Sequence, residues 1–137
     1  MTVGETPTGS EPVYLVVDDH DAFRSELCRR LRQECPGRIV ECRNGQEAIN
    51  AYEKFRPSWV VMDVEMPEMD GLSASRIIRA RFPDARIVVL TQHDSRELRA
   101  AAKKCGVMAF LPKENLDQLA HVLRPSGIPP SSPLCAP

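Results

Sequence analysis

The sequence predicts a single α/β domain in which a doubly wound, parallel sheet of five strands is covered on both faces by five helices. Short apolar runs alternate with segments of helical periodicity along most of the 137 residues. This alternation is typical of successive βαβ units, whose right-handed connections build an open three-layer sandwich. The length allows one hydrophobic core and is too short for two substantial domains.

Five apolar runs are the expected strands. Each is four to six residues long, and several end in a charged or hydroxyl side chain, as buried strands do where they emerge at a sheet edge. The expected strands are residues 13–17, 38–42, 58–62, 86–91 and 107–111.

The five segments that follow these runs are the expected helices. Each carries apolar residues at helical spacing on one face, and prolines or glycines end the segments. In chain order the apolar positions are Phe23, Leu27 and Leu31; Ala48, Tyr52 and Phe55; Leu72, Ile77 and Ile78; Leu98, Ala101, Ala102 and Cys105; and Leu116, Leu119, Ala120 and Leu123. We interpret the arginines of the first helix as its solvated face, and the Asp70-Gly71 pair as a turn without a chemical role.

Composition argues against several classes of protein. The formal net charge is -1 and the basic residues are spread along the chain, which disfavours a nucleic-acid-binding surface. The five cysteines lack C-x-x-C spacing, which disfavours a zinc site and a disulfide framework and fits the reducing cytoplasm. The sequence has no apolar run long enough for a membrane span. We expect a disordered extension over residues 1–11, one domain over 12–124, and a Pro/Ser-rich linker or tail over 125–137.

The acidic residues at strand ends indicate a metal site. Asp18 and Asp19 follow the first expected strand, and Asp63 follows the third. At an effective dielectric of about 20, two unit charges about 4 Å apart repel by roughly 4 kcal/mol, so three carboxylates in one pocket need a cation or a raised pKa. Mg²⁺ prefers oxygen ligands and keeps open positions for water and phosphate oxygens.

Thr91 ends the fourth expected strand and Lys113 lies just beyond the fifth, and they add a hydroxyl and an ammonium group to the same edge. Phosphoryl transfer would use every member of this set. The acids would hold the metal, one carboxylate would attack phosphorus, and the other two groups would hold phosphoryl oxygens.

These motifs resemble the receiver domains of bacterial two-component response regulators. The matching pieces, which lie in the order and at the strand ends of that family, are Val16-Val17-Asp18-Asp19-His20, Val61-Met62-Asp63 with the loop to Gly71, Val89-Leu90-Thr91 and Ala109-Phe110-Leu111-Pro112-Lys113. The resemblance covers residues from about 12 to 124 and implies a flavodoxin-like fold with strand order 2-1-3-4-5.

The resemblance also implies a role for each site residue. Asp63 would accept a phosphoryl group from the phosphohistidine of a sensor histidine kinase or phosphotransfer protein. Asp19 and Asp63 would bind Mg²⁺ directly, Asp18 through water, and Glu65 through its carbonyl. Thr91 and Lys113 would hold the phosphoryl oxygens.

Further expectations from the resemblance concern the switch. Thr91 and the aromatic residue Phe110 would change conformation on phosphorylation and alter the surface of the fourth helix, fifth strand and fifth helix, which is a possible homodimer face. Glu65 and His93, two residues beyond Asp63 and Thr91, would tune dephosphorylation. The motifs look most like receivers that precede a helix-turn-helix output domain, so DNA would be contacted only through such a domain. The chain would catalyse only its own phosphorylation and dephosphorylation.

Two other functions stay open from the residues. A Mg²⁺-dependent phosphohydrolase also uses a strand-end aspartate nucleophile, but usually has a second aspartate where this chain has Glu65. A degenerate receiver would bind partners without phosphorylation, which the complete set of acids, hydroxyl and lysine disfavours.

Taken singly, each of the five site residues would be read as a turn, cap or surface group; they are Asp18, Asp19, Asp63, Thr91 and Lys113. The three histidines would be read as surface or capping residues. Proline also precedes Lys113 here, whereas many receivers have it after the lysine.

Overall fold

The computed structural model describes residues 11–123, in which five parallel strands form one sheet. In chain order the elements are β2 (Val13–Val17), α1 (Asp21–Glu34), β3 (Arg38–Cys42), α2 (Gly45–Phe55), β4 (Trp59–Asp63), α3 (Gly71–Arg81), β5 (Ile87–Thr91), α4 (Arg96–Lys104), β6 (Ala109–Pro112) and α5 (Leu116–Leu123). The strand order β3-β2-β4-β5-β6 confirms the predicted fold class and the order 2-1-3-4-5.

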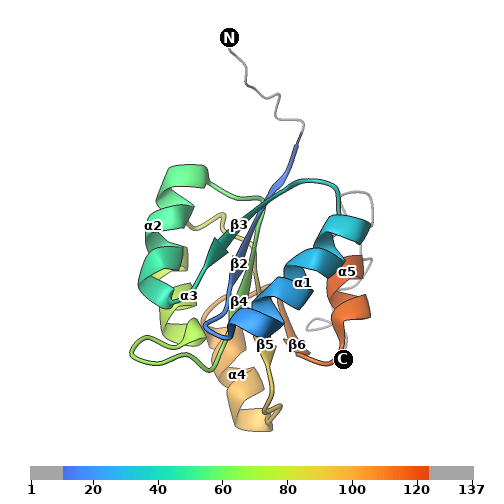
Figure 1. Ribbon diagram of the computed structural model, residues 1–137. Coiled ribbons are helices and arrows are strands. Elements are labelled where there is room, and N and C mark those ends of the chain that lie inside the picture. Colours follow the sequence, from blue (N-terminus) through green and yellow to red (C-terminus); the bar gives the residue numbers. More distant parts are fainter. Residues whose placement is uncertain (1–10, 124–137) are drawn as a thin grey trace.

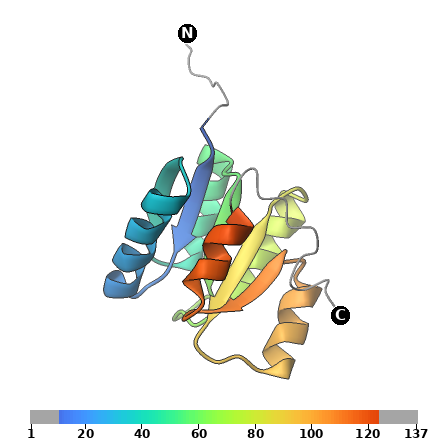
Figure 2. The ribbon, with the colours of Figure 1, turned by 90° about the vertical axis from the view of Figure 1, so that its right-hand side faces the viewer.

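The helices form two layers. In Figure 1, α1 and α5 lie on one side of the sheet and α2 and α3 on the other, and in Figure 2 the layer of α1 and α5 faces the viewer. Consecutive strand residues alternate between the layers, since Tyr14 and Val16 pack with the α1 and α5 side whereas Leu15 and Val17 pack with the α2 and α3 side. Two apolar cores therefore cover the sheet.

Local sequence explains where several helices begin. Asn44, Asp70 and Ser95 are the N-caps of α2, α3 and α4, and each side chain accepts a hydrogen bond from a main-chain N–H three residues on. The pair Asp70-Gly71, which we interpreted as a turn without a chemical role, supplies the N-cap and the first residue of α3. Gly106, with φ of 83°, follows α4 as a left-handed residue should.

The predicted strand boundaries agree closely with the structure. The largest difference is in the last strand, which starts at Ala109 because residues 107–108 still connect it to α4. Pro112 ends this strand at the edge of the sheet, where a missing N–H is tolerated. Among residues 11–123, none of the helices has the length and apolar character that crossing a membrane requires. The predicted extension and the linker over 125–137 lie outside the described residues, apart from Glu11.

Candidate functional site

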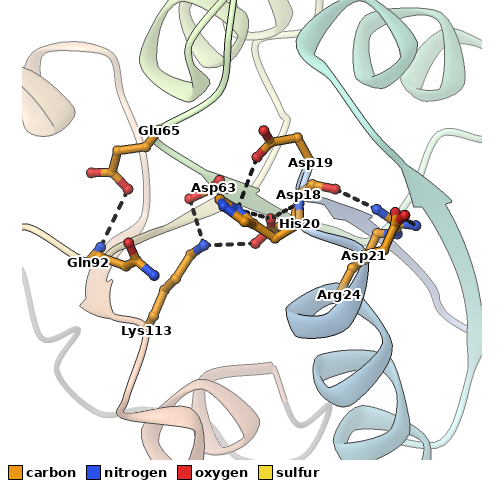
Figure 3. A network of polar contacts seen from close by, with 9 residues as sticks. All are labelled: Asp18, Asp19, His20, Asp21, Arg24, Asp63, Glu65, Gln92 and Lys113. Atoms are coloured by element: carbon orange, nitrogen blue, oxygen red, sulfur yellow. Dashed lines mark hydrogen bonds and ion pairs between the residues drawn. The ribbon is translucent and has the colours of Figure 1, made fainter.

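The carboxyl ends of β2 and β4 bring Asp18 and Asp63 together. The two strands are parallel neighbours with Val17 opposite Met62, so the residues that follow emerge side by side. Asp18 and Asp63 are each 1% exposed. Asp19, whose side chain is 29% exposed, lies at the rim of the same cluster (Figure 3).

Lys113 lies between the two buried acids. Its Nζ atom is 3.0 Å from Asp18 Oδ2 and 3.2 Å from Asp63 Oδ1, and the residue is 6% exposed (Figure 3). Its main-chain N–H donates to the carbonyl of Thr91 at 2.8 Å, and its Nζ sits 4.5 Å from the ring centroid of Phe23. The proline that precedes Lys113 therefore does not prevent the lysine from reaching the acids.

The buried carboxylate of Asp63 is unfavourable in its ionised form. Burial and then the negative charge of Asp18 raise the pKa of Asp63 to about 7, although Lys113 opposes them. Burial alone would lower the pKa of Lys113, but its contacts with Asp18 and Asp63 outweigh that effect and raise it. The ammonium group thus stays charged at neutral pH, whereas Asp63 has a strong preference for an additional cation.

The acid cluster fits a divalent metal ion. Asp18, Asp19, His20 and Asp63 each offer one ligand atom, and these atoms lie within 4.8 Å of one another. Asp63 Oδ2 is buried and accepts no hydrogen bond, which is costly for a carboxylate oxygen unless a cation binds there. The predicted metal-binding role of the Glu65 carbonyl stays a prediction.

His20 joins this cluster, although the sequence analysis gave it no metal role. Its Nδ1 lies 3.4 Å from Asp18 Oδ1 and 3.3 Å from Asp19 Oδ1. It is also the N-cap residue of α1, and its main-chain N–H donates to Asp18 Oδ1. Adjacency to the two aspartates was the only signal in the sequence for this contact.

The side chains of Thr91 and Glu65 are joined. Thr91 is fully buried, its hydroxyl donates to Glu65 Oε2 at 2.7 Å, and the same hydroxyl oxygen accepts from the N–H of His93 at 2.9 Å. Glu65 Oε1 accepts from the N–H of Gln92 at 3.4 Å (Figure 3). Three of the predicted site residues therefore form one hydrogen-bonded group, which sequence reasoning did not foresee.

Phe110 lies inside the core. It is opposite Val89 in the pairing of β5 and β6 and is 1% exposed. The guanidinium of Arg99 in α4 lies 4.9 Å from its ring centroid. The ring of Phe110 therefore contacts a side chain of α4, which belongs to the surface that we predict to change on phosphorylation. A part for Phe110 in the switch stays a prediction.

Arg24 corrects the interpretation of the first helix. We predicted that the arginines of this helix are solvated, but Arg24 is 8% exposed and donates to the carbonyl oxygen of Asp18 at 2.7 Å. It also pairs with Glu41 at 2.9 Å and Asp21 at 2.7 Å. Its position three residues before Leu27 places it on the buried stripe, and its three acceptors satisfy the buried charge.

Gly71 fixes the loop that follows Asp63. A Cβ atom at this position would lie 2.0 Å from the carbonyl oxygen of Asp63, so only glycine fits there. The N–H of Gly71 donates to the carbonyl of Val64 at 2.9 Å, which folds the loop back onto the strand end.

Comparisons with known proteins agree with this geometry. A family model described as "Response regulator receiver domain" matches residues 14–124. The chain is similar to the transcriptional regulatory protein DegU of Brevibacillus brevis, with 33% identity over 101 residues, which cover 73% of this chain and 43% of that protein. It is also similar to the transcriptional regulatory protein PdtaR of Mycobacterium tuberculosis, with 40% identity over 100 residues, which cover 72% of this chain and 48% of that protein.

A solved structure has the same fold. It is a response regulator protein from Burkholderia pseudomallei with a phosphorylated aspartic acid, a calcium ion and citrate, with a TM-score of 0.75, 26% identity, and coverage of 85% of this chain and 69% of that one. By contrast, the chain spans less than half the length of DegU and PdtaR.

Proposed function

The chain belongs to the family of response regulator receiver domains, whose members act as phosphorylation-activated signalling switches, and on this premise we propose that Asp63 accepts the phosphoryl group. The domain would span residues 12–124, with 1–11 and 125–137 as an extension and a linker. The observation that carries the proposal is the convergence of Asp18, Asp63 and Lys113, with a buried oxygen of Asp63 left without a hydrogen-bond donor.

In the proposed reaction, a carboxylate oxygen of Asp63 attacks phosphorus in line with the phosphohistidine. The new O–P bond forms as the P–N bond breaks, and the imidazole of the donor leaves with the electron pair. Lys113, which already contacts Asp63, would hold a phosphoryl oxygen, and the hydroxyl of Thr91 another. Mg²⁺ bound by Asp18, Asp19, Asp63 and the Glu65 carbonyl would neutralise the charge that develops on the phosphoryl oxygens.

Phosphorylation would change the surface formed by α4, β6 and α5 through Thr91 and Phe110. To shift the ratio of active to inactive conformations from 1:99 to 99:1, the phosphoryl group must interact more favourably with the active conformation by about 5.5 kcal/mol. Charge-assisted hydrogen bonds are worth roughly 1.5–3 kcal/mol each, so two or three new contacts to the phosphoryl group suffice. Glu65 and His93 would set the lifetime of the phosphorylated form, which unchanged decay in Glu65→Ala and His93→Ala proteins would contradict.

We place the domain in the cytoplasm. Its proposed partners are a sensor histidine kinase or phosphotransfer protein, and a second copy of this domain at the α4, β6 and α5 surface. Similarity to two transcriptional regulatory proteins supports a role in transcription, with DNA contacted through an output domain outside this chain. The phosphohydrolase alternative gains no support, because the usual second aspartate is replaced by Glu65, whose carboxylate accepts hydrogen bonds from Thr91 and Gln92.

Incubation with Mg²⁺ and acetyl phosphate tests the proposal. The wild-type protein should form a stoichiometric adduct that is stable in acid and labile in base, and Asp63→Asn should form none. Asp84→Asn, which removes an exposed acid, is the matched control and should behave as wild type. Steady release of phosphate without an adduct would support a phosphohydrolase, and neither result would support a degenerate receiver.

A further inference from the structure

The hydroxyl proton of Thr91 is already used within the protein. A threonine side chain has one O–H donor, and Thr91 gives it to Glu65 Oε2 at 2.7 Å. The main-chain N–H of His93 donates to the hydroxyl oxygen at 2.9 Å, which orients the group further. Because Thr91 is fully buried, water does not compete for this proton.

Glu65 is held at both carboxylate oxygens, by the last residue of β5 and by the residue that follows it. Oε2 accepts from Thr91, and Oε1 accepts from the N–H of Gln92 at 3.4 Å, the contact that is drawn in Figure 3. The two contacts link the chain after β4 to the carboxyl end of β5. The carboxylate therefore occupies the donor that a phosphoryl oxygen on Asp63 would need.

We infer that Glu65 is a positioning residue that holds Thr91 in the inactive arrangement, and that its bond to Thr91 must break before Thr91 can bind the phosphoryl group. The inference rests on the proposed function and adds that Glu65 competes with the phosphoryl group for the hydroxyl proton of Thr91. Both acceptors are anionic, and one proton serves only one of them at a time. A phosphoryl group on Asp63 also repels the nearby carboxylate, which favours the exchange.

Removal of the competitor should make activation easier. A hydrogen bond to a charged group contributes enough free energy that its loss corresponds to roughly a tenfold change in an equilibrium constant. Glu65→Ala should therefore tighten the binding of a phosphoryl mimic about tenfold. Glu65→Gln keeps a weaker, neutral acceptor and should have an intermediate effect.

The test is a titration with beryllofluoride in the presence of Mg²⁺, followed by ¹⁹F NMR of the bound anion. Each Glu65 variant is made in the wild-type background and in a Thr91→Val background, which lacks the hydroxyl. Glu68→Gln is the control, since it removes an exposed acid from the same loop. We expect tightening in Glu65→Ala and Glu65→Gln with Thr91 present, less than about a twofold change in the Thr91→Val background, and no change for Glu68→Gln.

Equal tightening in both backgrounds would overturn the inference, because it would show a simple charge effect that does not act through Thr91. Unchanged affinity in the wild-type background would overturn it too, and Glu65→Gln supplies this result if the alanine variant does not fold. If wild-type protein binds no beryllofluoride, or Asp63→Asn binds it equally well, the proposed function itself fails and the inference with it.

Discussion

The Nζ atom of Lys113 lies 3.2 Å from Asp63 Oδ1, and both residues are almost completely buried. The ammonium group counters part of the charge that Asp18 and Asp63 share, yet the pKa of Asp63 is still raised to about 7. When Asp63 is ionised, the two buried acids therefore carry one more negative charge than Lys113 can balance, and Asp19 at the rim adds another. This excess is the electrostatic basis for binding a divalent metal ion.

Lys113→Ala should destabilise the domain more at pH 8 than at pH 5. Removal of one partner from a buried charge cluster costs about 3–5 kcal/mol. At pH 5 Asp63 is protonated, so only the buried carboxylate of Asp18, which lies 3.0 Å from the lysine, loses a needed partner, whereas at pH 8 both acids do. Urea unfolding in metal-free buffer at both pH values measures the difference. Lys104→Ala, which removes an exposed lysine, should change little at either pH. An equal loss at pH 5 and pH 8 would contradict the explanation.

The raised pKa of Asp63 predicts a loss of stability with rising pH. The folded state keeps the proton up to about pH 7, whereas the carboxyl of the unfolded chain ionises near its ordinary pKa of 3.8. The stabilisation is thus complete below the unfolded pKa and lost as pH rises through the folded pKa, by about 2–3 kcal/mol between pH 5 and pH 8. Asp63→Asn lacks this group, so its unfolding free energy should stay flatter over that range in metal-free buffer. If the unfolding free energies of the wild-type and Asp63→Asn proteins changed equally with pH, Asp63 would not be the group responsible.

Gly71→Ala should impair folding and phosphorylation together. Its Cβ would meet the carbonyl oxygen of Asp63 at 2.0 Å, so the strand end or the helix start must move. We expect a loss of about 2 kcal/mol or more and slower reaction with acetyl phosphate. Gly45→Ala, at the first residue of α2, is the matched control, because its Cβ would meet mainly the flexible side chain of Met69. Similar effects in both variants would contradict the specific role of Gly71.

Arg24→Ala should destabilise the domain by about 2–4 kcal/mol, since it removes a donor to the Asp18 carbonyl and leaves acceptors without partners. Apparent Mg²⁺ affinity should fall as well, because the loop that carries Asp18 loses its anchor. Arg29→Ala removes an exposed i,i+3 pair with Glu26 and should cost less than about 0.5 kcal/mol. Thermal unfolding with and without Mg²⁺ measures both effects. Equal losses of stability in Arg24→Ala and Arg29→Ala would show that the buried contacts of Arg24 have no special role.

The sequence allowed the fold and the core of the candidate site to be predicted. The fold follows from the order of strands and helices, and the site lies where the strands end. Parallel strands in register bring Asp18 and Asp63 together whatever path the connecting loops take. The alternation of apolar runs and helical stripes placed the strands to within two residues, since burial on both sheet faces leaves a clear pattern.

Other features depended on details that a pattern does not contain. The pairing of Glu65 with Thr91 joins the loop after β4 to the end of β5, and the conformation of that loop is set by tertiary contacts. The burial of Arg24 could have been suspected from its spacing to Leu27, but charged residues at such positions are usually exposed. One acceptor, Asp21, is in the same helix, whereas Asp18 and Glu41 are brought to Arg24 by the fold. The requirement for Gly71 follows from a backbone approach that only coordinates reveal.

The most direct test of the central claim is to locate the phosphoryl group. Protein treated with acetyl phosphate, with Mg²⁺ or with EDTA, is reduced with borohydride, which converts a phosphorylated aspartate to homoserine, and its peptides are sequenced by mass spectrometry. We predict homoserine at position 63, only with Mg²⁺, and a strong reduction of that signal in Asp19→Asn. Homoserine at another acidic residue, or an equal yield at position 63 in EDTA, would contradict the account.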